Sequence, residues 1–147
     1  MHVFLVYVRD AAYFRLLPGS GGGSTPDDRV RVMAFPPLGI QTLAPVLRRA
    51  GHRVRMFDTC HPRMRAEHVA QAAREDRPDV IALSSLSVTA YPALKSLAQT
   101  VKSANPGIPI IVGGPFASIN ATRILADCPS IDHVGAGEGE ELLLDYL

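Results

Sequence analysis

Short apolar runs recur along the chain at nearly even intervals, and this spacing limits the possible folds more than any other feature. The first run, VFLVYV, is apolar at every position, which is typical of strands buried on both faces of a parallel sheet. We expect strands at Val3–Val8, Val54–Phe57, Val80–Leu83, Ile108–Val112 and His133–Val134.

Segments with helical periodicity separate these runs. We expect helices over residues 38–50, 64–75, 90–104, 117–126 and 138–147. Gly51 is a natural stop for the first of them, whereas Pro45 predicts that this helix is kinked or begins only near Thr42. Thr89 is the expected N-cap of the third helix, with Pro92 in its first turn.

Five strand–helix units in series predict an α/β protein. The expected architecture is a flavodoxin-like or Rossmann-like five-stranded parallel sheet, in the order 2-1-3-4-5, with helices on both faces. The chain has 147 residues, enough for one domain with a sizeable core, so we expect a single domain over 1–147.

The composition excludes several functional classes. The net charge is +1, which gives no reason to expect nucleic acid or an anionic membrane as a partner. The two cysteines, Cys60 and Cys128, form neither a CxxC motif nor a metal-ligand spacing. The apolar run at the N-terminus is too short for a signal sequence or a membrane span, so the expected location is the cytoplasm.

One segment interrupts the regular alternation. Residues 9–35 separate the first strand from the first helix and include 18-PGSGGGSTPDD-28. The composition predicts a flexible glycine-rich insert, since a loop of this length is usually functional or disordered. The insert matches neither a Walker loop nor a dinucleotide fingerprint.

The loops after the third, fourth and fifth strands are built from Ser, Thr and Gly. They read 84-SSLSVT-89, 113-GGP-115 and 135-GAGEGE-140. Ligands of such sheets bind at the carboxyl ends of the strands, where the strand order reverses. No nucleophile elbow is present, and a metal or catalytic cluster at Asp58, Cys60 and His61 is the weaker alternative to a polar turn. The loops favour holding a large cofactor over chemistry by side chains.

The pair 84-SSL-86 and 113-GG-114 resembles the Ser-x-Leu and Gly-Gly motifs of cobalamin (vitamin B12)-binding domains. Together with 36-PPLGIQTLAPVLRRAGHRVRMFD-58 and 132-DHVGAGEGEELL-143, the motifs are similar to the N-terminal module of cobalamin-dependent radical SAM proteins. The resemblance covers nearly the whole chain outside the insert. It implies that Ser84 bonds the nucleotide tail of cobalamin and that Gly113 and Gly114 let its flat base pass.

The resemblance also implies a set of cofactor-binding residues. These are Leu38, Gly39, Ser84, Ser85, Leu86, Ser87, Thr89, Gly113, Gly114, Pro115, Gly135, Gly137 and Glu138.

Two departures from the family pattern change the expectation. The segment after the first strand has Asp10 but lacks the histidine of Asp-x-His-x-x-Gly, so bound cobalamin is expected base-off, with no histidine on cobalt. No Cys-x-x-x-Cys-x-x-Cys is present, so the radical SAM half is expected in another segment or chain. That half would carry the [4Fe-4S] cluster and S-adenosylmethionine and would perform methyl transfer or a related reaction, while this module orients the corrin.

Two alternatives stay open from the sequence. The domain could be a degenerate relative that no longer binds cobalamin and serves a structural or interaction role. It could also be a small flavodoxin-like nucleotide-binding enzyme that uses Asp58 and Glu138.

Overall fold

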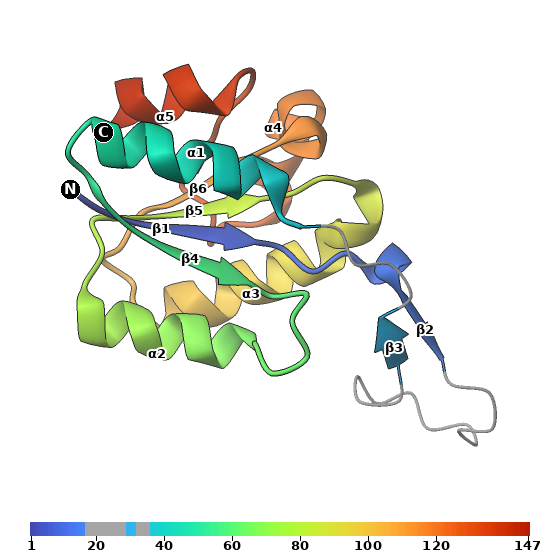
Figure 1. Cartoon of the computed structure of the whole chain (residues 1–147). Coiled ribbons are helices and arrows are strands. Elements are labelled where there is room, and N and C mark those ends of the chain that lie inside the picture. Colours follow the sequence, from blue (N-terminus) through green and yellow to red (C-terminus); the bar gives the residue numbers. More distant parts are fainter. Residues whose placement is uncertain (17–28, 32–35) are drawn as a thin grey trace.

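Five parallel strands form the main sheet, in the spatial order β4-β1-β5-β6-β7 (Figure 1). The structure, a computed structural model, describes residues 1–16, 29–31 and 36–147. Numbered along the chain, the strands of this sheet lie in the order 2-1-3-4-5, which confirms the predicted fold. They are β1 (His2–Tyr7), β4 (Arg53–Asp58), β5 (Val80–Ser84), β6 (Ile110–Gly113) and β7 (His133–Val134).

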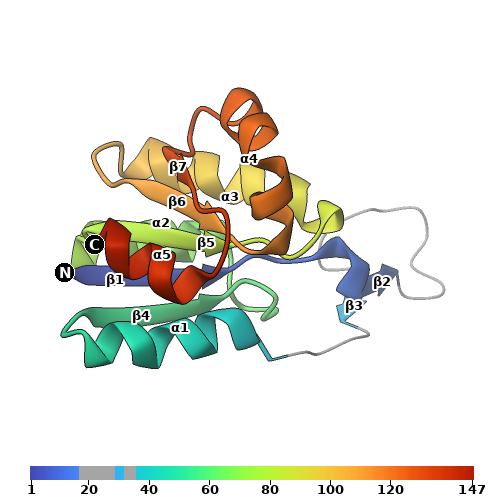
Figure 2. The ribbon, with the colours of Figure 1, turned by 90° about the horizontal axis from the view of Figure 1, so that it is seen from above.

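Helices cover both faces of the sheet (Figure 2). α1 and α5 pack on one face, and α2 and α3 pack on the other, with α4 beside α3. The bounds are α1 (Leu38–Arg49), α2 (Ala66–Asp76), α3 (Tyr91–Ala104), α4 (Pro115–Asp127) and α5 (Gly139–Tyr146).

Strand β1 supplies side chains to the core on both faces. Phe4 and Val6 point toward α2 and α3, whereas Val3, Leu5 and Tyr7 point toward α1 and α5. Because successive side chains of a strand alternate, a strand covered on both faces must be apolar at every position. This explains the continuous apolar run in the sequence.

Helix α1 begins at Leu38 and continues through Pro45, so the predicted start near Thr42 is wrong. Pro45 lies on the exposed side of the helix, next to exposed Gln41, where water can replace the missing backbone hydrogen bond. Gly51 ends the helix with a φ of 87°, as expected from its position.

Thr89 is not the N-cap of α3, which corrects the prediction from the sequence. A short 3-10 helix, Val88–Ala90, precedes α3, and Ser87 is its N-cap. The residue before α3 is Ala90, which makes no side-chain cap bond, and Pro92 occupies the first turn as expected. The Thr89 hydroxyl instead donates to Asp10 at 2.5 Å.

The described part of the insert extends beyond the carboxyl end of β1 (Figure 1). A 3-10 helix, Ala11–Tyr13, leads into a two-stranded antiparallel sheet of β2 (Phe14–Leu16) and β3 (Arg29–Arg31). Phe14 is buried against the core on the α1 side. The insert predicted to be flexible comprises about residues 9–35; its residues 9–16 and 29–31 contain these short elements, and the prediction for the remainder lies outside the described residues. None of the described helices is both long and apolar enough to cross a membrane.

Candidate functional site

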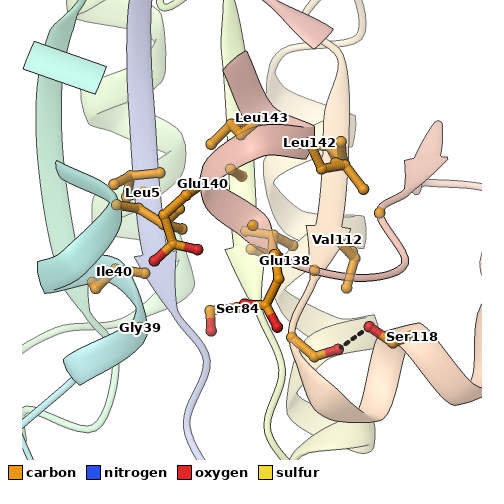
Figure 3. A pocket seen from close by; sticks show the side chains of 18 of the residues that line it. Leu5, Gly39, Ile40, Ser84, Val112, Ser118, Glu138, Glu140, Leu142 and Leu143 are labelled. Carbon is orange, nitrogen blue, oxygen red and sulfur yellow. Dashed lines mark hydrogen bonds between the residues drawn. The ribbon is translucent and has the colours of Figure 1, made fainter. Parts of the chain in front are cut away.

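A cavity of about 500 Å³ lies between the sheet and helices α1 and α5, toward the carboxyl ends of β5 and β6 (Figure 3). This is where the strand order of a doubly wound sheet places a ligand, and the volume suits a small-molecule site. The described residues that line it are Leu5, Gly39, Ile40, Thr42, Leu43, Ala82, Leu83, Ser84, Leu86, Ile111, Val112, Gly113, Gly114, Pro115, Ser118, Gly135, Gly137, Glu138, Gly139, Glu140, Leu142 and Leu143.

Apolar side chains form most of the wall. Among the lining residues that the structure describes, Glu138 and Glu140 are the only titratable ones. They extend from the start of α5 toward Ser84 (Figure 3). Ser84 Oγ has no hydrogen-bond partner among the described residues. The described wall therefore offers a ligand one hydroxyl without a partner and two carboxylates, and it contains no cationic side chain for a phosphate.

The two glycines after β6 have different roles. A Cβ added to Gly113 would meet nothing within 4 Å. Since Gly113 follows Ile111 by two positions in β6, its added side chain would point to the α1 and α5 face, where the cavity lies. A Cβ on Gly114 would instead lie 2.6 Å from the Ser85 carbonyl oxygen, and the φ of Gly114 is 103°. Gly113 leaves space in the cavity, and Gly114 permits a backbone turn against Ser85.

Ser118 connects two of the loops that border the cavity. Its hydroxyl donates to the Gly114 carbonyl at 3.1 Å and accepts a hydrogen bond from the Gly137 amide at 3.2 Å. Figure 3 draws the first of these bonds. Through Ser118, the turn after β6 and the loop after β7 are held together on one side of the cavity.

Asp10 forms a second polar cluster, between the loop after β1 and the loop after β5. The carboxylate is 3% exposed and accepts from Ser87 and Thr89, each at 2.5 Å, and from the Ala12 amide at 2.9 Å. Burial raises the pKa of Asp10, but these hydrogen bonds lower it by more, so the pKa lies below its ordinary value. The cluster joins the start of the insert to the main sheet.

Most of the residues that the sequence assigned to the cofactor line the cavity, and four do not. Leu38 is 63% exposed at the start of α1, and Ser85 is fully buried, with a hydroxyl that has no partner among the described residues. Ser87 and Thr89 bond Asp10 instead of facing the cavity. The residues brought together are Gly39, Ser84, Leu86, Gly113, Gly114, Pro115, Gly135, Gly137 and Glu138.

Sequence reasoning missed the walls formed by side chains of helices and strands. Leu43, Leu142 and Leu143 come from α1 and α5, and Ala82 and Ile111 come from β5 and β6. Their apolar periodicity predicted burial in a core, and nothing in that pattern separates a core position from a cavity wall. Ser118 carried a usable signal, since it is a polar residue one turn into a helix that follows Gly-Gly.

Neither the histidines nor the alternative metal cluster belongs to this cavity. The five histidines are all described, and none is among the lining residues. Asp58 accepts from the Cys60 amide at 2.8 Å, Cys60 is buried and His61 is exposed. No group of three or more metal-ligating side chains forms within the described ranges, so the alternative of a metal site at these residues is wrong.

Comparisons with known proteins identify relatives of this chain. Residues 29–147 match the family model of the B12 binding domain. A hopanoid C-3 methylase from Methylococcus capsulatus is 38% identical over 108 residues, which cover 71% of this chain and 20% of that protein. An uncharacterized methyltransferase from Pyrococcus horikoshii is 29% identical over 105 residues, covering 71% and 22%.

A third relative is a different kind of enzyme. The anaerobic magnesium-protoporphyrin IX monomethyl ester cyclase of Rubrivivax gelatinosus is 27% identical over 114 residues, which cover 77% of this chain and 20% of the cyclase. The chain thus spans about a fifth of the length of these curated relatives.

Proposed function

Because the chain belongs to the B12-binding domain family, we propose that it binds cobalamin and places the nucleotide tail of the cofactor in the cavity between the sheet, α1 and α5. The observation that carries this proposal is the combination of an apolar cavity, the Ser84 hydroxyl and the open space beside Gly113. A flat base needs such space next to the backbone. When bound, the cobalt of cobalamin supplies methyl transfer or one-electron chemistry.

The residues of the cavity fit the tail better than they fit a nucleotide cofactor held by its phosphates. The dimethylbenzimidazole base is flat and mostly apolar, and it has one ring nitrogen that can accept a hydrogen bond when it is not bound to cobalt. Ser84 offers the matching donor. The described lining contains no Lys, Arg or His, so a phosphate group would lack a cationic partner in the wall. The tail of cobalamin carries a single phosphodiester, whereas a nucleoside di- or triphosphate carries more negative charge, so this lining disfavours a nucleoside polyphosphate more strongly than the tail.

We also propose that cobalamin binds base-off, with its own base displaced from cobalt, and that no histidine of this chain takes the place of the base on cobalt. Asp10 occupies the loop after β1, and its carboxylate bonds two hydroxyls and an amide instead of a histidine. The absence of histidine from the lining supports the same inference. Electron paramagnetic resonance of the bound Co(II) form should show no axial nitrogen coupling. Labelling histidine with ¹⁵N should leave the spectrum unchanged, and a change on labelling would contradict the proposal.

The wider role that we propose is that of a module for a radical SAM enzyme. That enzyme would carry a [4Fe-4S] cluster and S-adenosylmethionine in a domain in cis or trans, and this module would orient the corrin for methyl transfer or a related reaction. The similarity to a methylase, a methyltransferase and a cyclase supports this role.

Retention of hydroxocobalamin tests binding directly. The purified chain is mixed with hydroxocobalamin and desalted, and the visible spectrum of the protein fraction is recorded. We expect the chromophore to stay with the unmodified chain and to be lost from Gly113→Val, whose side chain would enter the cavity. Gly107→Val is the matched control, since a Cβ at Gly107 also meets nothing within 4 Å but lies outside the cavity lining. A folded chain that retains no chromophore would favour the degenerate, structural alternative.

A further inference from the structure

The wall of the cavity changes from apolar to polar with increasing exposure. Its buried side chains on the α1 and α5 face are all apolar: Leu5, Ile40, Ile111 and Leu143, none more than 4% exposed. Leu83 and Val112 also border it, but their side chains pack in the core of the opposite face. The polar side chains of the described wall are half-buried, as in Ser84 and Ser118, or more open, as in Thr42 and Glu138. The part of a ligand that enters furthest therefore meets hydrocarbon.

Two of the three hydroxyl side chains in the described wall are already engaged in hydrogen bonds. Ser118 already bonds Gly114 and Gly137, and the Thr42 hydroxyl donates to the Gly39 carbonyl at 2.9 Å. After β6, the Gly113 carbonyl accepts from Ser85 and the Val112 carbonyl accepts from Gly135. The amides in the first turns of α1 and α5, apart from that of Leu38, have by contrast no partner among the described residues.

Ser84 therefore carries the only hydroxyl of the described wall that has no partner, and the amides at the starts of α1 and α5 are further donors near the cavity rim. The carboxylates of Glu138 and Glu140 can only accept when ionised. Glu138 is exposed and Glu140 is half-buried, so neither belongs to the hydrocarbon interior.

We infer that this cavity selects cobamides by the chemistry of their lower base, and that it prefers a benzimidazole-type base over an adenine-type base. The inference rests on the proposed function. A benzimidazole presents one ring nitrogen for Ser84 and otherwise needs only an apolar surface. Adenine adds an exocyclic amine with two donors and further ring acceptors. Buried against hydrocarbon without partners, these groups cost free energy that the same groups do not cost in water.

The test compares three corrinoids with the same corrin ring on the intact chain. Equilibrium dissociation constants are measured by absorbance titration for hydroxocobalamin, for its adenine-base analogue and for cobinamide, which has no base. We expect hydroxocobalamin to bind at least about tenfold more tightly than the adenine-base analogue, since one buried unpaired polar group suffices for that ratio. Ser84→Ala should weaken hydroxocobalamin binding by about 2- to 12-fold.

A polar substitution in the wall gives a second, independent readout. Ala82→Ser adds a hydroxyl to β5 on the cavity side. We expect this variant to lower the ratio of the dissociation constant of the adenine-base analogue to that of hydroxocobalamin. Ala93→Ser is the matched control, because Ala93 packs against the core on the opposite face and should leave the preference unchanged.

The outcomes separate this inference from the proposed function. Equal affinity for the two bases, or tighter binding of the adenine-base analogue, overturns the inference while cobalamin binding stands. Cobinamide that binds as tightly as hydroxocobalamin also overturns it, because the base would then contribute nothing. No binding of any of the three corrinoids overturns the proposed function together with the inference.

Discussion

Replacing Gly114 by alanine tests how the two glycines after β6 divide their roles. The new Cβ would lie 2.6 Å from the Ser85 carbonyl oxygen and 3.3 Å from the Ser85 nitrogen, so it would collide with backbone rather than with a movable side chain. Gly114 also has φ 103° and ψ 172°, a combination that is essentially restricted to glycine.

The structure sets the size of the expected effect. Strain from the backbone conformation costs about 1–3 kcal/mol. Steric overlap in a packed region costs about 1–3 kcal/mol more. We therefore expect Gly114→Ala to lower the free energy of unfolding by about 2–6 kcal/mol, whereas Gly113→Ala, whose Cβ meets no neighbour, should stay within about 0.5 kcal/mol of the unmodified chain.

Urea denaturation followed by far-ultraviolet circular dichroism measures both variants against the unmodified chain. The midpoint of Gly114→Ala should fall with little change in the slope of free energy against urea, since the surface exposed on unfolding stays the same. If Gly114→Ala were as stable as Gly113→Ala, the reasoning that Ser85 requires glycine at position 114 would be refuted. The close approach to Ser85 is thus a second reason for glycine at position 114, and the expected passage of the flat base beside Gly114 stays a prediction.

Three further predictions concern the polar contacts. Asp10→Asn should lower the free energy of unfolding by about 1–3 kcal/mol near neutral pH. Because the pKa of Asp10 is lowered in the folded chain, the stability that its carboxylate adds should be present above pH 3.8 and vanish as the pH falls further. Acid titration of the unmodified chain and of Asp10→Asn would measure this difference. Burial and the hydrogen bond to Asp127 raise the pKa of Tyr91 from 10.0 to about 12, so the stability that this side chain adds is complete below pH 10 and declines above it. The stability of Tyr91→Phe should therefore depend less on pH between about 10 and 12, as urea denaturation at several pH values would measure. Ser118→Ala should lower the free energy of unfolding, measured by urea denaturation, by about 0.5–1.5 kcal/mol. It should also weaken hydroxocobalamin binding in an absorbance titration. Unchanged affinity would show that the hydrogen bonds of Ser118 do not shape the site.

The fold was predictable because each strand carries its own signal. The run VFLVYV is buried on both faces, and the other strands lie within two residues of their predicted positions. The order 2-1-3-4-5 followed from the series of strand–helix units and was confirmed. Helix starts were harder to predict, because they depend on contacts distant in sequence. Threonine is a common N-cap residue, yet the hydroxyl of Thr89 donates a hydrogen bond to Asp10, which precedes it by 79 residues.

The candidate site was predictable only where a loop sequence is distinctive. The motifs at Ser84 and at Gly113-Gly114 do lie together at the cavity, and their role in cofactor binding stays a prediction. The helical walls could not be found from the sequence, since Leu43 and Leu142 follow the same periodicity as any core leucine. The different roles of the two glycines were also hidden, because only the structure reveals how close Ser85 lies to Gly114.

The cavity also affects how firmly α5 is held. Only Leu143 of this helix is buried, whereas α3 buries Tyr91, Leu94, Leu97, Ala98 and Val101. With the cavity between α5 and part of the sheet, α5 can detach without disturbing the tightly packed opposite face. Its amide hydrogens should therefore exchange with solvent deuterium through local opening, while those of α3 require opening of the whole domain. A ligand that fills the cavity would slow exchange in α5 first, which makes this helix the natural reporter of occupancy.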